Sequence, residues 1–272
     1  IFLGGKRMGF FKKIFQKGEA AAPETTPQMP ERIKPDAITT VNLKEEIKAD
    51  AITTINLRKE KLNKICLEKK ELQDLTSKVV VVLDYSGSMD QLYRDGVVQE
   101  TLNRLLPLAL RFDDDGEMEL FIFSNNYKQL PSLNINNFDN YIKNEKVLKK
   151  YSMGGTNYSP VINKVIDNQE GDIPTFVIFI TDGDCFLSDK TPTEEAIRKA
   201  SNKPIFWQFV GIGNSSFDFL ESLDDMQGRY IDNADFLKIS NVCNLSDEEL
   251  YKALLGEFPE WLNAAKLNNI IK

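Results

Sequence analysis

One segment of the chain runs Lys78-Val79-Val80-Val81-Val82-Leu83-Asp84 and continues as Tyr85-Ser86-Gly87-Ser88-Met89. Its first half is an unbroken series of aliphatic, mostly β-branched residues, which is typical of a central strand buried on both faces of a parallel sheet. Its second half is a turn of small polar residues that begins at a carboxylate. The segment therefore predicts a buried strand whose carboxyl end carries polar groups.

Further segments predict strands of the same sheet, over residues 117–123, 175–182 and 204–211. Helical patterns lie between them, near residues 97–111, 158–168, 192–202, 216–225 and 246–264. This alternation predicts an α/β fold, a doubly wound and mostly parallel sheet with helices on both faces. In such folds the ligand site lies beyond the carboxyl ends of the strands, where Asp84 and Asp182 are both expected.

The composition of the chain excludes several classes of protein and several kinds of catalytic or metal site. With 272 residues, 42% of them hydrophobic, the chain fits one α/β domain with an N-terminal extension. No window reaches the roughly 20 apolar residues that span a bilayer. The absence of histidine excludes a Ser/His/Asp triad and a His-ligated zinc site. Three widely separated cysteines, Cys66, Cys185 and Cys243, favour a reducing, cytoplasmic location.

Charge and turn residues divide the chain into four parts. Residues 1–78 carry a net charge of +5 and the remainder −12, so we expect no nucleic-acid binding by the folded part. We expect a disordered, basic and Pro-containing tail over 1–35, a repeat-bearing linker or lead-in over 36–77, the main domain over 78–265 and a C-terminal tail over 266–272. Within the first part, the apolar and basic residues Phe10 to Phe15 suit either a disordered tail or weak contact with a membrane surface.

A short repeat occupies the lead-in. Asp-Ala-Ile-Thr-Thr-Val-Asn-Leu-Lys at 36–44 recurs as Asp-Ala-Ile-Thr-Thr-Ile-Asn-Leu-Arg at 50–58. Two copies are too few for a solenoid, and each Ile-Thr-Thr core favours a short strand. We interpret the repeat as a duplication within a linker, with a docking peptide for a partner as the alternative. Residues 58–77 suit either a helix or an extended segment.

Three short polar segments lie along the chain, the first and third at the ends of predicted strands and the second in a loop. They are Asp84-Tyr85-Ser86-Gly87-Ser88, then Gly154-Gly155-Thr156-Asn157, then Thr181-Asp182-Gly183. Together they offer two carboxylates and three hydroxyl groups, an all-oxygen set that suits a hard cation such as Mg²⁺. The glycines allow a tight turn and a close approach of the backbone.

This set of residues resembles the metal-ion-dependent adhesion site of the von Willebrand factor A (vWA) fold, with no substitution among the five positions. The resemblance implies one Mg²⁺ or Mn²⁺, bound directly or nearly so by Ser86, Ser88 and Thr156 and largely through water by Asp84 and Asp182. It also implies an open coordination position for an acidic group of a partner protein.

Further segments narrow the resemblance to the vWA domains of bacterial tellurium-resistance (TerF-like) proteins, which are relatives of the copine A domain. They include Leu105-Leu106-Pro107-Leu108-Ala109-Leu110-Arg111-Phe112, Met153-Gly154-Gly155-Thr156-Asn157-Tyr158 and Phe206-Trp207-Gln208-Phe209-Val210-Gly211. The resemblance covers roughly residues 58–265 and implies a metal-dependent protein-binding module in a bacterial stress or toxic-anion response. Residues 1–57 are too short for the TerD-type domain that often accompanies it.

Other features of the sequence have alternative interpretations. A Mg²⁺-dependent hydrolase is the alternative function, although only the two aspartates offer a base. No P-loop follows the first strand, and Asp113-Asp114-Asp115-Gly116 lacks the spacing of a calcium loop and predicts a turn. Cys185 is interpreted as a plain thiol rather than a redox group. Tyr85 and Tyr158 suit either packing or the rim of the site.

Overall fold

A computed structural model describes residues 37–272. All side-chain contacts given below belong to the unit of residues 43–272. The tail predicted over 1–35, with its Phe10 to Phe15 segment, lies outside the described residues. Among residues 37–272, no helix combines the length and apolar character that a membrane span requires.

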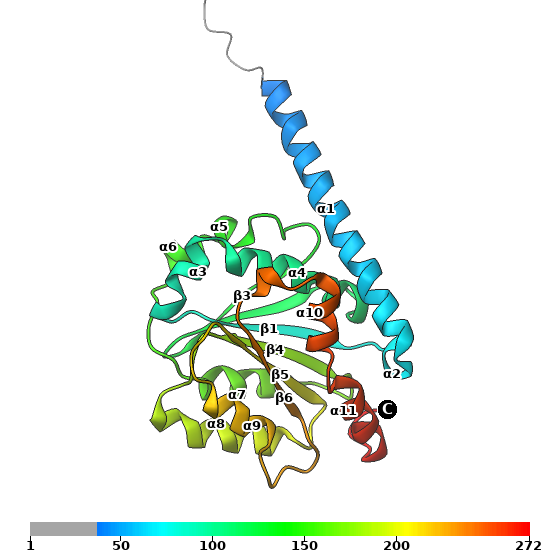
Figure 1. The fold of residues 1–272 in the computed structure, drawn as a ribbon, viewed down its shortest axis with the longest axis vertical. Helices are drawn as coiled ribbons and strands as arrows, with labels where there is room; N and C mark the ends of the chain where they lie inside the picture. Colours follow the sequence, from blue (N-terminus) through cyan, green and yellow to red (C-terminus); the bar gives the residue numbers. More distant parts are fainter. Residues whose placement is uncertain (1–36) are drawn as a thin grey trace, which may run out of the picture. The chain divides into compact units, whose positions relative to one another are not determined.

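The centre of the fold is a six-stranded sheet in the order β3-β2-β1-β4-β5-β6 (Figure 1). The strands are β1 Lys78–Asp84, β2 Met118–Phe123, β3 Tyr127–Leu133, β4 Thr175–Thr181, β5 Ile205–Ile212 and β6 Ala234–Ile239. All neighbours pair in parallel except β3, which runs antiparallel to β2 at one edge. The predicted α/β fold is thereby confirmed.

Burial on both faces explains why the central strands are so apolar. Every residue of β4 and β5 is buried, as are all residues of β1 after Lys78. The edge strand β3 is different, because only Leu130 and Leu133 are buried in it and it contains Pro131, which an edge strand tolerates. Sequence analysis did not anticipate β3 or β6, whose more polar segments lack the continuous apolar signal.

Helices cover both faces of the sheet. On one face lie α4 (Val97–Phe112), α10 (Asp247–Leu254) and α11 (Phe258–Leu267), and on the other lie α7 (Ser159–Asn168), α8 (Leu187–Ala200) and α9 (Asp218–Asp224) (Figure 1). The short helices α2 (Lys70–Gln73), α3 (Asp90–Arg94), α5 (Tyr141–Asn144) and α6 (Val147–Lys150) complete the connections. Each face has its own apolar core, and the two cores are separated by the sheet.

The prediction of short strands in the repeat is wrong. Residues Ala37–Glu68 form one long helix, α1, and the second copy lies in its middle. Ile55, Leu62 and Ile65 are buried in the core shared with α4 and α11, at spacings that place them on one helix face. The hydroxyl groups of Thr53 and Thr54 donate to carbonyls four residues earlier, so these β-branched residues fit the helix. Tertiary packing therefore overrides the local strand preference.

The C-terminal region also differs from expectation. The single helical pattern over 246–264 is two helices, α10 and α11. Ser246 and Glu249 form a capping box that begins α10, and α11 begins at Phe258, with Pro259 in its first turn. Ile271 is buried in the core, so the last residues pack against the domain and are not a free tail. Helix α8 begins five residues earlier than the predicted 192–202.

Candidate metal centre

The predicted site lies at the carboxyl ends of β1 and β4, which are neighbours in the sheet. Leu83 pairs with Ile180, so Asp84 at the end of β1 comes level with Thr181 at the end of β4. The chain leaves β1 toward β2 on one side, and β4 lies on the other. This is the point at which a doubly wound sheet opens a crevice for ligands.

A chain of hydrogen bonds joins four of the five predicted residues. Asp84 Oδ1 accepts the backbone N–H of Ser86 at 2.7 Å. The hydroxyl groups of Ser86 and Ser88 are 3.0 Å apart, and Ser88 Oγ donates to Asp182 Oδ1 at 2.8 Å. The structure thus brings Asp84, Ser86, Ser88 and Asp182 together although 94 residues separate Ser88 from Asp182 in the sequence.

Thr156 lies on the adjoining loop. Gly154 forms a parallel bridge with Ser86, and Gly87 N donates to Gly154 O at 3.1 Å, so the two loops are in contact. Thr156 O accepts the N–H of Phe186 at 3.0 Å, which fixes its backbone. Among the described residues, no hydrogen bond ties the Thr156 hydroxyl group to the other four residues.

The β2–β3 turn holds this second loop, a role that sequence analysis missed. Asn125 Oδ1 accepts the N–H of Gly155 at 2.6 Å, and Ser124 O accepts the N–H of Asn157 at 2.9 Å. A Cβ atom on Gly155 would lie 2.4 Å from ring atoms of Phe186 and 2.6 Å from Asn125 Oδ1. A side chain at position 155 would therefore have to displace the side chains of Phe186 and Asn125.

Thr181 is a second residue whose role sequence analysis did not assign. Its hydroxyl group donates to Asp84 Oδ2 at 2.6 Å, so both oxygens of that carboxylate are held. The only sequence signal for it is its place as the last residue of β4, immediately before Asp182.

The site concentrates negative charge without a basic partner. Asp84 is fully buried, and burial raises its pKa to about 6 against the lowering effect of the Thr181 and Ser86 hydrogen bonds, with Asp182 raising it further. Among the described residues, neither Asp84 nor Asp182 forms an ion pair with lysine or arginine. Two carboxylates and nearby hydroxyls form an all-oxygen donor set, and a divalent cation fits its charge and chemistry.

The tyrosines near the site are packing residues. Tyr85 is buried and its hydroxyl group donates to the carbonyls of Val147 and Tyr151. Tyr158 is fully buried, and its hydroxyl group bonds Gly183 O and lies 3.4 Å from Thr181 Oγ1. Burial also raises the pKa of the Cys185 thiol to about 12, which is unfavourable for redox chemistry.

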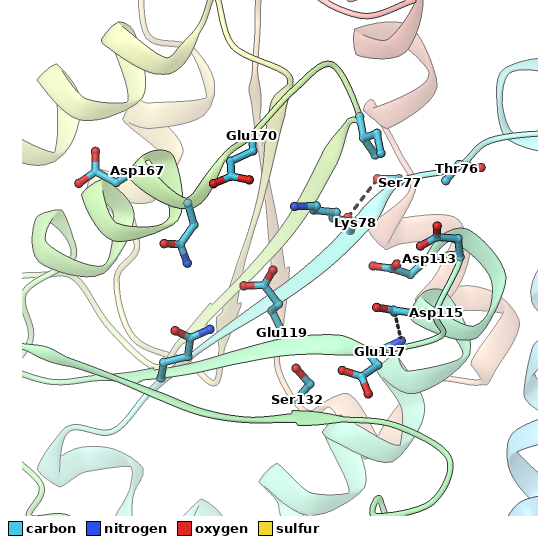
Figure 2. A pocket seen from close by; sticks show the side chains of 14 residues that line it. Thr76, Ser77, Lys78, Asp113, Asp115, Glu117, Glu119, Ser132, Asp167 and Glu170 are labelled. Atoms are coloured by element: carbon cyan, nitrogen blue, oxygen red, sulfur yellow. Dashed lines mark hydrogen bonds between the residues drawn. The ribbon is translucent and has the colours of Figure 1, made fainter.

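The acidic turn at Asp113–Asp115 lies at the opposite end of the sheet. It connects α4 to β2, as predicted, with Asp115 Oδ1 accepting the N–H of Glu117 at 2.7 Å. Figure 2 shows this turn beside Lys78 and Glu119 in a pocket of about 560 Å³. The pocket is lined by the amino ends of strands and is separate from the site at Asp84.

Several known proteins are similar to this chain in sequence or in structure. The uncharacterized protein YcbR of Bacillus subtilis (strain 168) is 41% identical over 218 residues, which are 77% of this chain and 87% of YcbR. Proximal thread matrix protein 1 from the mussel byssus is 20% identical with a TM-score of 0.48, over 67% of this chain and 48% of that one. A further structure of that mussel protein has zinc in its MIDAS motif, the metal-ion-dependent adhesion site (19% identity, TM-score 0.45, 67% and 48% covered).

The vWA2 paralogue of ArnB from Sulfolobus acidocaldarius is 18% identical with a TM-score of 0.45, over 66% of this chain and 44% of that one. The chain thus spans about half the length of these solved structures. Residues 76–271 match the vWA-TerF-like family, described as the vWA found in the TerF C terminus. The protein belongs to the vWA-TerF-like family.

Proposed function

We propose that the domain is a metal-dependent protein-binding module, in which Asp84, Ser86, Ser88, Thr156 and Asp182 hold one Mg²⁺ or Mn²⁺. The observation that carries the proposal is the hydrogen-bonded group of carboxylates and hydroxyls at the ends of β1 and β4, with Asp84 buried and without a basic partner. A bound divalent cation would supply positive charge and an open coordination position for an acidic side chain of the partner.

The residues around the ligands have distinct roles in this proposal. Thr181 and the Ser86 N–H hold the Asp84 carboxylate in one orientation. Ser86 and Ser88 present hydroxyl oxygens between the two carboxylates. The Gly154-Gly155 loop, fixed by Asn125, carries Thr156 next to them. A preorganised donor set of this kind lowers the cost of ordering the loops when the cation binds.

We further propose a nonenzymatic role in the cytoplasm of a bacterium, within a stress or tellurium-resistance type of system. The family match and the similarity to a Bacillus protein support the setting. Three free cysteines, two of them buried, are consistent with a reducing compartment. The chain holds no histidine, and with both site aspartates assigned as ligands neither is free to act as the general base of a hydrolase.

Metal titration followed by calorimetry and by thermal unfolding tests the proposal. Mg²⁺, Mn²⁺ and Ca²⁺ are compared with EDTA on the wild-type chain, on Asp84→Ala and on the milder Ser88→Ala. Asp167→Ala, which removes an exposed carboxylate of α7, is the matched control. A cation at about 100 times its Kd adds roughly 2.7 kcal/mol to the free energy of unfolding.

We expect Mg²⁺ or Mn²⁺ to stabilise the wild-type chain and the Asp167→Ala variant, and the two site variants to lose that stabilisation. Equal binding by the wild-type chain and both site variants would contradict the assignment of the ligands. A metal-dependent pull-down that is abolished by EDTA then identifies the acidic partner.

A further inference from the structure

A second surface feature adjoins the proposed metal site. A pocket of about 700 Å³ lies between α3 and the segment that contains α5 and α6, and we name it the basic groove. Its apolar part is formed by Tyr93, Ile142 and Leu148, of which Leu148 is the most exposed at 36%. Its rim carries Lys143, Lys146 and Lys149, all exposed. The groove therefore combines an apolar floor with a cationic edge.

The charge of the groove is opposite to that of the domain around it. Residues 79–272 carry a net charge of −12. Among the described residues, none of these three lysines forms an ion pair, and Arg94, also at the groove, pairs with Asp90 on its own helix. The positive charges of the three lysines repel one another, and an anionic occupant would relieve that repulsion.

The two walls of the groove are attached to the metal-binding loop. Tyr93 forms part of the floor, and its hydroxyl group donates to the backbone oxygen of Asp84 at 3.0 Å. The ring of Tyr85, which lies between Asp84 and Ser86 in the sequence, packs edge to face on Tyr93 with centroids 5.1 Å apart. Tyr85 in turn donates to Val147 O, in α6. Figure 1 shows α3 and α6 as neighbours near the edge at which β1 ends.

The backbone holds the lysines in defined positions. Lys146 has φ +56° and Asn140 has φ +52°, both in the left-handed region that lysine rarely adopts. Hydrogen bonds from the N–H groups of Lys149 and Lys150 to Lys146 O, each 2.9 Å long, stabilise this turn. The residues that start α5 and α6 thus fix where the cationic edge lies.

We propose that the basic groove binds the segment that flanks the metal-ligating carboxylate of the partner, and that this segment is an acidic peptide with an apolar residue. This inference rests on the proposed function of the metal site. The lysines would contact the carboxylates of the peptide, and the floor formed by Tyr93, Ile142 and Leu148 would cover its apolar side chain. The metal site alone accepts any accessible carboxylate, so the groove supplies the selectivity for sequence.

Selection from a random peptide library, carried out with Mg²⁺ on the wild-type chain, tests the inference. The expected consensus is one acidic residue flanked by further acidic residues and a Leu, Ile or Phe. The affinity of the selected peptide is then measured on Lys143→Glu/Lys149→Glu and on Leu148→Ser. The matched control is Lys199→Glu/Lys266→Glu, which makes the same charge change at two exposed lysines outside the groove.

We expect the groove charge variant to bind the peptide roughly tenfold more weakly at low salt, the Leu148→Ser variant to lose the preference for an apolar residue, and the control to bind as the wild type does. Calorimetry with Mg²⁺ alone should give the same affinity for all of these proteins. An acidic peptide without the apolar residue should bind more weakly than the selected one.

The outcomes separate the two proposals. Peptide binding that needs Mg²⁺ and Asp84 but is equal in the groove variants and the wild type would overturn the groove and leave the metal site standing. Groove-dependent binding that persists in EDTA would support the groove and contradict the metal-dependent function. A consensus without acidic residues, or tighter binding of phosphatidylserine vesicles or single-stranded RNA than of any selected peptide, would overturn the inference.

Discussion

The close contact at Gly155 allows a quantitative test of how the Thr156 loop is built. In Gly155→Ala, the new methyl group would lie 2.4 Å from Phe186 ring carbons and 2.6 Å from Asn125 Oδ1. Carbon atoms prefer separations of about 3.5–4.0 Å, so both neighbours must move. The Phe186 ring is 52% exposed and can rotate into solvent at little cost.

Asn125 is the neighbour that determines the energy of this substitution. Its side-chain oxygen accepts the Gly155 N–H at 2.6 Å, and moving it away breaks that hydrogen bond. One exposed hydrogen bond with the accompanying distortion is worth about 1–1.5 kcal/mol. Alanine also restricts the unfolded chain, which offsets about 0.4–1 kcal/mol of this loss, so we expect Gly155→Ala to lower the free energy of unfolding by up to about 1 kcal/mol.

Gly87→Ala provides the matched control within the same site. No atom lies within 4 Å of a Cβ at Gly87, and its φ is outside the left-handed region. Replacing a glycine with alanine at such a position stabilises a protein by about 0.4–1 kcal/mol, because the unfolded chain loses conformational freedom. This gain is common to both variants and cancels between them, so their free energies of unfolding should differ by the local cost at Gly155, about 1–1.5 kcal/mol.

Thermal unfolding in EDTA measures this difference without a contribution from metal. For a domain of this size, the Tm of Gly155→Ala should lie roughly 2–6 °C below that of Gly87→Ala. Equal Tm values for the two variants would refute the reasoning, because they would mean that the loop relaxes freely around a methyl group at position 155.

Two further predictions concern stability away from the metal site. Burial and neighbouring carboxylates raise the pKa of Asp224 to about 6 in the folded protein. The charged form therefore destabilises the fold above about pH 6. Below the pKa of an aspartate in the unfolded chain, about 4, the side chain is neutral in both states and this effect is absent. Asp224→Asn should accordingly be more stable than the wild type by roughly 1 kcal/mol at pH 8, the difference vanishing near pH 4 in urea titrations; a difference independent of pH would contradict this origin. Arg104, whose side chain is only 4% exposed, lies 3.1 Å from Asp247 and donates to Val242 O and Leu245 O, so Arg104→Ala should cost about 3 kcal/mol. Lys61→Ala removes a more exposed partner of the same carboxylate and should cost under about 0.5 kcal/mol, and similar losses in urea unfolding would argue against a buried ion pair.

The predictions from sequence were most accurate for the central strands and for the residues at their carboxyl ends, because the strand itself sets the environment of these residues. Val79 to Leu83 lie in a strand covered on both faces, so the segment has to be continuously apolar and is recognisable without a partner. The same logic places Asp84 and Asp182 at one edge, because parallel strands end together. Their hydrogen-bonded contact through Ser88 follows from that topology.

The sequence by itself therefore determined the class of fold, the sheet edge that carries the site and the oxygen donors offered there. Only the tertiary structure decided that the Ile-Thr-Thr repeat is helical, since Ile55 gains more from burial against the core than it loses in helix propensity. Only the tertiary structure, likewise, brought Thr181 to Asp84, Asn125 to Gly155 and the lysine-bearing segment 143–149 to the groove that Tyr93 also lines. Such contacts join segments far apart in the chain, and no local periodicity records which segments the folded core brings together.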